Sequence, residues 1–139
     1  MSGRKNVLLP YKILTDGDMS TASLTSSVTE IKYLDDIGIQ LDWTGSPVGS
    51  FAIQISADHK EYPVASPAKT TTTGNWTPLT LTYWNGSSFV TDTSVPTSLG
   101  SPIFLDLALL SAPYIRVVYT KGSGSGTLQI TITAKEIGG

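Results

Sequence analysis

The residues able to do chemistry in this chain are few and scattered. His59 is the only histidine, and its Ala-Asp-His-Lys-Glu setting is typical of a turn, so we expect it to face solvent. The sequence has no cysteine, which leaves neither a thiol nucleophile nor a thiolate metal ligand to act beside it. The serines are numerous, but none lies in a Gly-x-Ser-x-Gly turn. We therefore expect a protein that is not an enzyme.

Acidic residues offer an alternative chemistry, the binding of a calcium ion at one rim of the fold. Calcium prefers oxygen ligands, but the acidic residues concerned do not have EF-hand spacing, and Asp16-Gly17-Asp18 is more simply a turn. The candidates for such a rim site are Asp16, Asp18, Asp35, Asp36 and Asp42. The glycines between 122 and 126 do not form a phosphate-binding loop, because no helix follows them. We expect no metal and no other cofactor.

The three tryptophans, Trp43, Trp76 and Trp84, could stack on a sugar, and Arg116 is a further candidate for contact with a partner. Trp43 is in register with apolar residues of its strand, which indicates a place in the core. Trp84 and Asn85 lie at a predicted hairpin tip, where Trp84 serves either local packing or a partner surface. Arg116 points outward between two apolar neighbours, and either pairs with an acidic residue or binds across an interface.

The elements that position these residues follow a period of two, which is the mark of half-buried strands. Residues 114–120 and 128–135 alternate in this way around a Gly/Ser segment and predict a closing hairpin. Residues 37–43 and 51–56 alternate around a short Gly/Pro loop and predict a second hairpin. Asn85-Gly86 predicts a third, protruding hairpin within residues 76–91, and residues 103–107 form a further strand.

The first 26 residues are expected to form an extended N-terminal arm ahead of a sandwich domain over residues 27–139. Residues 7–14 predict one strand at a sheet edge, because Pro10 cannot donate a ladder hydrogen bond. An arm of this kind often becomes ordered against a neighbouring subunit, which makes its apolar residues partner-contact candidates. These residues are Val7, Leu8, Leu9 and Tyr11. The alternative is an ordinary first strand followed by a loop.

Composition limits both the fold and the partners. Hydrophobic residues make up 40% of the chain and charged residues only 14%, while Ser and Thr supply 36 residues, as suits strands and turns. The net charge is −2 and the basic residues are dispersed, so we expect neither nucleic-acid nor membrane binding. No apolar run is long enough to cross a membrane. Eight or nine short strands without an amphipathic helix predict a single-domain, antiparallel β-sandwich of the jelly-roll type.

Two stretches of the chain resemble a known group of proteins. Residues 37–45 and 49–56, with Pro113 to Thr120 and Gly122 to Leu128, are similar to small virion proteins of tailed bacteriophages. Within that group the jelly-roll cement or decoration proteins of capsids are closest in size and character. The resemblance implies a non-enzymatic virion protein, assembled in the host cytoplasm, that stabilises the head shell.

The partners implied are the major capsid protein or another virion protein, together with further copies of the chain as a dimer or trimer. The same stretches are also similar to galactose-binding-like jelly rolls, in which a strand ending in Gln-x-Ser precedes a late Tyr-x-Arg strand. That resemblance implies a carbohydrate-binding module of a phage tail or fibre. Against it, the usual disulfide is absent and the Asp58-His59-Lys60 turn lacks the expected glycine.

Overall fold

The structure, a computed structural model, describes residues 6–31, 34, 36–61, 71–72, 74–108 and 110–136. Its elements in chain order are β1 (Asn6–Asp18), β2 (Ser23–Thr25), β3 (Thr29–Glu30), β4 (Asp36–Gly45), β5 (Val48–Ser56), β6 (Lys60–Glu61), β7 (Thr71–Thr72), β8 (Thr77–Pro78), β9 (Leu81–Trp84), β10 (Phe89–Asp92), β11 (Val95–Pro96), the 3₁₀-helix η1 (Thr97–Leu99), β12 (Ile103–Ala108), β13 (Tyr114–Ser123) and β14 (Gly126–Glu136).

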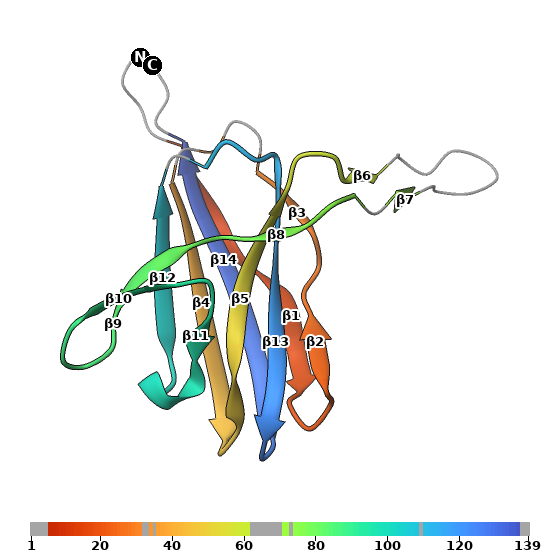
Figure 1. Cartoon of the computed structure of the whole chain (residues 1–139). Helices are drawn as coiled ribbons and strands as arrows, with labels where there is room; N and C mark the ends of the chain where they lie inside the picture. The colour runs from red at the N-terminus through yellow and green to blue at the C-terminus, as the bar shows by residue number, and fades with distance from the viewer. Residues whose placement is uncertain are drawn as a thin grey trace.

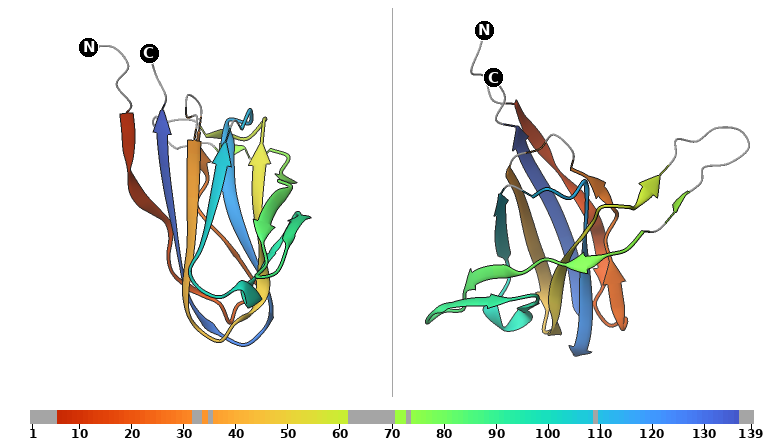
Figure 2. Two further views of the ribbon diagram at one scale, coloured as in Figure 1. Left: turned by 90° about the vertical axis from the view of Figure 1, so that its left-hand side faces the viewer. Right: turned by 45° about the horizontal axis from the view of Figure 1, so that its top comes forward.

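Two antiparallel sheets face each other (Figures 1 and 2). One has the strand order β1-β14-β4-β12, and the other has the order β11-β5-β13-β2, with β3 pairing β13 and β8 pairing β5. The first and last long strands are thus neighbours, and most connections cross from one sheet to the other. This is the strand order of a jelly roll. The predicted fold class, an all-β antiparallel sandwich, is confirmed.

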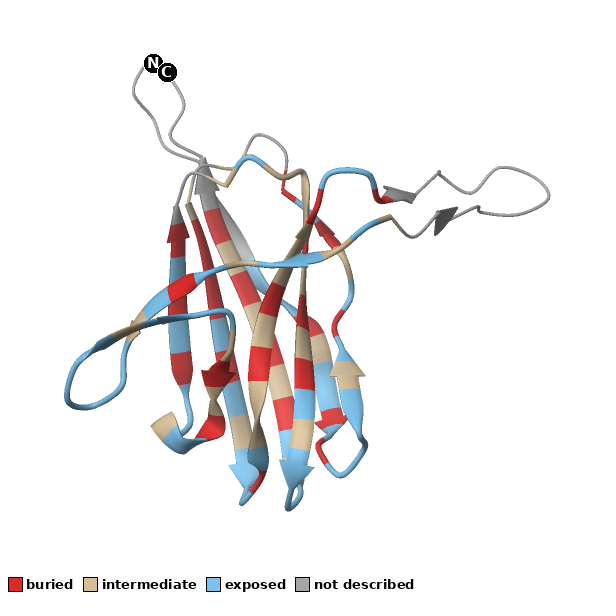
Figure 3. Cartoon of the chain, viewed as in Figure 1, coloured by how far each residue is buried: buried red, intermediate tan, exposed pale blue. Residues whose placement is uncertain are grey.

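The core lies between the sheets and follows the predicted alternation. In β4 the side chains of Ile39 and Leu41 are buried while Gln40 is exposed, and Phe51 and Ile53 of β5 face them from the other sheet. Figure 3 shows this banding along the long strands. Full burial of one such side chain contributes about 1.5–3 kcal/mol. The alternating apolar residues are therefore the main reason that these segments form a sandwich.

Two of the predicted hairpins are wrong, although their strands are right. β13 pairs with β2, β3 and β5 in one sheet, whereas β14 pairs with β1 and β4 in the other. In the same way β4 and β5 lie in opposite sheets. A period of two shows which face of a strand is buried but says nothing of its partner. Each short link crosses the thickness of the sandwich instead of turning back within a sheet.

The two links lie against each other, and glycine makes this approach feasible. Ser46 donates its backbone N–H to the carbonyl oxygen of Ser125 at 3.0 Å, and Gly45 pairs with Gly126. Gly45 has φ +87° and Gly124 has φ +75°, a region that favours residues without a Cβ. The Gly/Ser segment therefore serves a close contact between the two links.

The predicted arm over residues 1–26 enters the sandwich within its described part. β1 pairs with β14 from Asn6↔Glu136 to Asp18↔Thr127, and β2 pairs with β13. β1 lies at the edge of its sheet, as Pro10 predicts. Ile13 and Met19 are buried in the core shared with residues 27–136. The described part of the arm and the sandwich therefore form one structural unit.

Candidate functional site

Strand β12 forms the second edge of the four-stranded sheet. It pairs with β4 without interruption, from Ile103↔Leu41 to Ala108↔Asp36. Its beginning is fixed by Ser101, whose hydroxyl donates to Asp42 Oδ1 at 3.0 Å and accepts the backbone N–H of Trp43 at 2.8 Å. No described strand pairs with the far side of β12. This leaves a straight, regular strand edge open.

The segment that faces this open edge comes from the other sheet. β8 pairs with β5 at Gln54 and Ile55, and the N–H of Leu79 donates to the carbonyl of Ile53 at 2.7 Å. The chain then leaves the sheet as the two-stranded ribbon of β9 and β10, which flares away from the sandwich in Figure 1. The ribbon is the hairpin that Asn85-Gly86 predicts, and that prediction is confirmed.

The tip of the ribbon is held by Asn85. Its Oδ1 accepts the backbone N–H groups of Ser87 and Ser88, both at 2.9 Å, and its own N–H donates to the Ser88 carbonyl. Gly86 has φ +103°, which this loop requires. Asn85 therefore shapes the loop that carries Trp84 and Phe89, and its side-chain oxygen is engaged within the chain.

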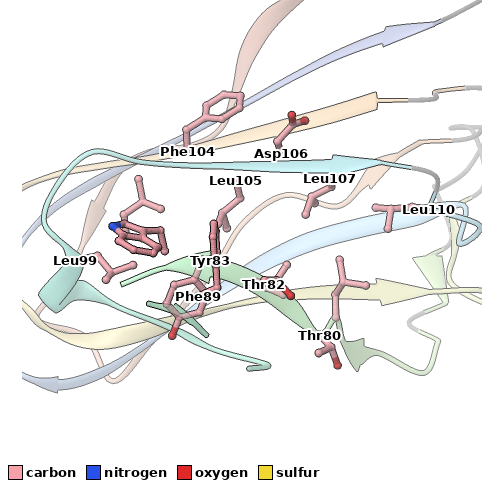
Figure 4. A pocket seen from close by; sticks show the side chains of 14 residues that line it. Thr80, Thr82, Tyr83, Phe89, Leu99, Phe104, Leu105, Asp106, Leu107 and Leu110 are labelled. Atoms are coloured by element: carbon pink, nitrogen blue, oxygen red, sulfur yellow. The ribbon is translucent and has the colours of Figure 1, made fainter. Parts of the chain in front are cut away.

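Between the ribbon and β12 lies an apolar groove of about 670 Å³, which we call the β12 groove. Its lining residues are Leu79, Thr80, Leu81, Thr82, Tyr83, Trp84, Phe89, Leu99, Ile103, Phe104, Leu105, Asp106, Leu107 and Leu110. Leu105 and Leu107 point toward the ribbon, whereas Phe104 and Asp106 point to the outer face of the sheet (Figure 4). Asp106 is the one charged residue among the described residues that line the groove. The groove is therefore lined mainly by apolar side chains, with Thr80, Thr82 and one carboxylate among them.

Aromatic side chains are exposed at the groove to an unusual degree. Trp84 is 54% exposed, Phe89 74% and Phe104 57%. Trp84 and Phe89 contact each other edge to face, with ring centroids 5.1 Å apart. Exposed large apolar residues gathered beside a groove are typical of surfaces that bind another molecule. This gathering is the strongest indication of a binding site on the described surface.

A second, smaller hollow lies on the outer face of the same sheet. It has a volume of about 270 Å³ and shares Phe104 and Asp106 with the β12 groove. The ring of Phe104 lies over Gly38, where a Cβ would collide with it. Asp36 lines the same hollow and adds a second carboxylate. The outer face of β12, with Phe104 and Asp106, is thus exposed beside its open edge, whereas Ile103, Leu105 and Leu107 on its inner face are buried.

The structure brings together only part of the predicted contact set. Trp84 and Asn85 lie at the ribbon, and Trp84 lines the β12 groove. Val7, Leu8, Leu9 and Tyr11 belong to β1, at the opposite edge of the four-stranded sheet. Tyr11 is 52% exposed and its hydroxyl lies 3.4 Å from that of Thr29.

Arg116 lies elsewhere, on β13 of the other sheet. Its guanidinium stacks over the ring of Trp76 at 4.1 Å, and its Nε donates to Gln54 Oε1 at 2.8 Å. Burial lowers the pKa of this guanidinium from its ordinary value. Arg116 therefore packs against residues of its own chain, so the alternatives of an acidic neighbour or an interface need not be invoked for its position.

His59 is buried, and the expectation that it faces solvent is wrong. Its ring lies 5.4 Å from that of Trp76 and 5.2 Å from that of Tyr114. Its backbone N–H donates to Ser56 Oγ at 3.1 Å. Asp58 beside it has a lowered pKa, chiefly because the backbone N–H of Asn75 donates to its carboxylate. The turn is thus closed over His59 by contacts between distant parts of the chain.

Sequence reasoning missed Phe89 and Phe104 as site residues. The signal for Phe104 is present, because the alternation that buries Ile103 and Leu105 must direct the aromatic residue between them outward. Phe89 follows the Asn85 loop and faces Trp84 across the ribbon. An aromatic residue in an outward strand position is the feature that marks both.

The described residues contain neither a group of three acidic, histidine or cysteine side chains placed to hold a metal ion nor a helix fit to cross a membrane. Asp16 instead accepts a hydrogen bond from Gln129, and Asp18 accepts the N–H and hydroxyl of Ser20. Asp35 lies outside the described residues. Asp18 thus serves a local turn, whereas Asp16 joins β1 to β14.

Comparison with known proteins gives a likeness of fold. No protein-family model matches the chain, and no curated protein sequence matches it. Among solved structures it is similar to the crystal structure of the SPBc2 prophage-derived protein YomS, with a TM-score of 0.55 and 9% sequence identity. The likeness covers 96% of each chain. The chain therefore shares its fold, over nearly its whole length, with a protein of prophage origin.

Proposed function

We propose that this protein is a non-enzymatic structural component of a bacteriophage particle, and that it binds the head shell as a cement or decoration protein. The observation that carries the proposal is the β12 groove, an exposed apolar groove beside an open strand edge. The shared fold with a prophage-derived protein and the resemblance to virion proteins support a phage setting. The protein acts in the virion, after assembly in the host cytoplasm.

The mechanism is adhesion. A strand edge offers main-chain hydrogen bonds to an extended segment, and the side-chain pockets beside it give selectivity. The β12 groove combines such an edge with exposed aromatic side chains, which bury large areas on contact. The partner is the major capsid protein or another virion protein, whose extended segment lies in the groove. Contacts between copies, as a dimer or trimer, would close junctions on the shell.

The charge of the chain suits closely repeated placement on a shell. The chain has nine basic and eleven acidic residues, so its net charge is −2 and the repulsion between neighbouring copies is small. The scattered basic residues offer no stripe for phosphates, and we propose no nucleic-acid or membrane partner.

The test is to count the copies of this protein in purified particles of the parent phage by quantitative mass spectrometry, with the major capsid protein as the internal standard. A ratio near one, or a simple fraction such as one-third, is expected for a protein that covers the shell. A few copies per particle would place it in the tail and reject the cement role. Complete absence from particles would reject the virion function itself.

A second candidate, a carbohydrate-binding module of a tail or fibre, is favoured by the exposed pair of Trp84 and Phe89. Aromatic faces are the surfaces on which sugar rings stack, and Trp84 is 54% exposed. Glycan-array binding that is lost in Trp84→Ala, and kept in the control Thr93→Ala at the exposed residue just after β10, would support this function. Absence of binding to any glycan by the unaltered protein would reject it.

A further inference from the structure

We propose that the β12 groove binds an extended segment of a neighbouring protein, added as a strand to β12, in which apolar residues alternate with lysine or arginine. This inference rests on the proposed function, because it specifies the segment that the virion partner supplies. It is argued from the backbone of β12, from the two hollows beside it and from their charges.

The backbone of β12 is suited to receive a strand. Antiparallel pairing with β4 engages every second residue of β12, and the residues between them direct their N–H and C=O groups to the open side. The register runs from Ile103 to Ala108 without a bulge. The strand contains neither proline nor lysine, two residues that commonly blunt an edge. An incoming strand therefore meets a regular row of donors and acceptors.

The side chains of an incoming strand would enter two different environments. Alternate residues would lie on the ribbon side of the sheet, in the β12 groove beside the buried side chains of Leu105 and Leu107, and this position favours apolar side chains. The residues between them would lie on the outer face beside Phe104 and Asp106, over the smaller hollow. The two hollows thus demand opposite properties from successive residues.

Charge selects the outer residues of the incoming strand. Among the side chains that the structure describes, the smaller hollow is lined by two carboxylates, Asp36 and Asp106, and neither hollow is lined by a basic one; the backbone of Lys135 pairs with that of Asp36. Opposite charges on facing strand positions are favourable and like charges are unfavourable. A lysine or arginine opposite Asp106 would extend its aliphatic stem along the ring of Phe104 and place its charge between the carboxylates.

The same charges disfavour a second copy of β12 as the occupant. Antiparallel self-pairing centred on Leu105 would oppose Asp106 to Phe104 of the other copy. It would also bring the two Asp106 residues to diagonal positions, with their backbones about 7–8 Å apart. Each copy would add Asp36 to the same side. A segment with basic residues is therefore the better complement.

The experiment uses a dye-labelled peptide of about eight residues that alternates valine with lysine, titrated with the full chain and followed by fluorescence anisotropy. A valine–glutamate peptide of equal length is the charge control. A valine–lysine peptide N-methylated along one edge keeps its side chains and loses the N–H donors of that edge. We expect saturable binding of the first peptide alone.

Two variants assign the binding to the groove. Asp106→Lys is expected to lower the affinity for the valine–lysine peptide about fivefold and to raise the affinity for the valine–glutamate peptide. Asp92→Lys changes the net charge equally on the ribbon, outside both hollows, and should leave both affinities unchanged. Circular dichroism of both variants confirms that each is folded.

Three results would overturn the inference. Equal affinity for the two unmodified peptides, or no binding of either, would remove the charge preference. Unchanged affinity of the N-methylated peptide would remove strand addition. Dimers of the protein that dissociate on adding the peptide would make a second copy the occupant. None of these results depends on phage particles, so they leave the copy-number test of the proposed function independent.

Discussion

The two edges of the four-stranded sheet are built in opposite ways. β1 carries Pro10 and Lys12, and its pairing with β14 shifts register three times along its length. β12 pairs with β4 in unbroken register and has an apolar groove beside it. Proline, lysine and bulges are the devices by which proteins keep an edge from joining other strands. The difference shows that one edge is protected and the other is left available.

The largest expected effect tests whether β1 is an integral edge strand. Ile13 is buried in the core, and truncating it to alanine should lower the free energy of unfolding by about 2–5 kcal/mol. The neighbouring Thr15 is exposed, and Thr15→Ala should change the free energy of unfolding by less than about 0.5 kcal/mol. Urea denaturation of both variants measures the contrast. Equal values would mean that β1 behaves as a detachable arm.

An intermediate effect is expected on self-association. Asp106→Val removes the one charge that the described residues contribute to the β12 groove and should convert part of the protein into dimers, while the free energy of unfolding changes by less than about 0.5 kcal/mol. Lys12→Val makes the matching change on β1, where Pro10 and the register shifts remain.

Sedimentation velocity at several concentrations distinguishes the two variants. Dimers of the Asp106→Val variant alone would support the view that β12 is the available edge and β1 the protected one. Equal association of both variants would show that charge protects the two edges alike and would remove the distinction.

The smallest effect concerns pH at the end of β1. The pKa of Asp18 is lowered from 3.8, first because the Ser20 hydroxyl donates to its carboxylate and then because the Ser20 N–H does. Because the pKa is lower in the folded state than in the unfolded state, the ionised carboxylate stabilises the fold at pH values above 3.8. This stabilisation is lost as the pH falls below 3.8 and passes through the folded-state pKa.

Amide hydrogen exchange followed between pH 5 and pH 3 measures this effect. The Ser20 and Thr21 amides should lose protection on acidification in the unaltered protein and should be nearly insensitive to pH in Asp18→Asn. The β12 amides serve as the internal reference. Equal acid sensitivity at β12 would assign the effect to the whole fold.

The sequence allowed the faces of the strands to be predicted but not their partners. Alternation is local, so the burial of Ile39, Leu41 and Leu105 could be predicted from a few residues each. The Asn85 loop is also local, and its ribbon was predicted correctly. Pairing is not local, because β14 joins β1 and β4 over more than eighty residues of chain, and alternation alone therefore predicts two hairpins that do not form.

The site was less predictable than the fold for the same reason. His59 is buried because Trp76 and Tyr114, from separate elements, pack against it. The β12 groove exists only where β12 and the ribbon, which belong to different sheets, leave space between them. Outward Trp84 could be identified from its own hairpin, whereas the groove that it lines depends on the arrangement of both sheets.

The position of β14 between β1 and β4 has a consequence for how the protein is made. The last long strand of the chain joins the first to the rest of the sheet, and Asn6 pairs with Glu136 near its end. Until β14 has left the ribosome, β1 has no partner in the sheet, and the side of β4 that later pairs with β14 is unpaired. Sheets that depend on such distant contacts form slowly. β4 and β12 can pair before that, but the sheet is completed only after synthesis of β14, and the nascent chain carries unpaired strand edges until then.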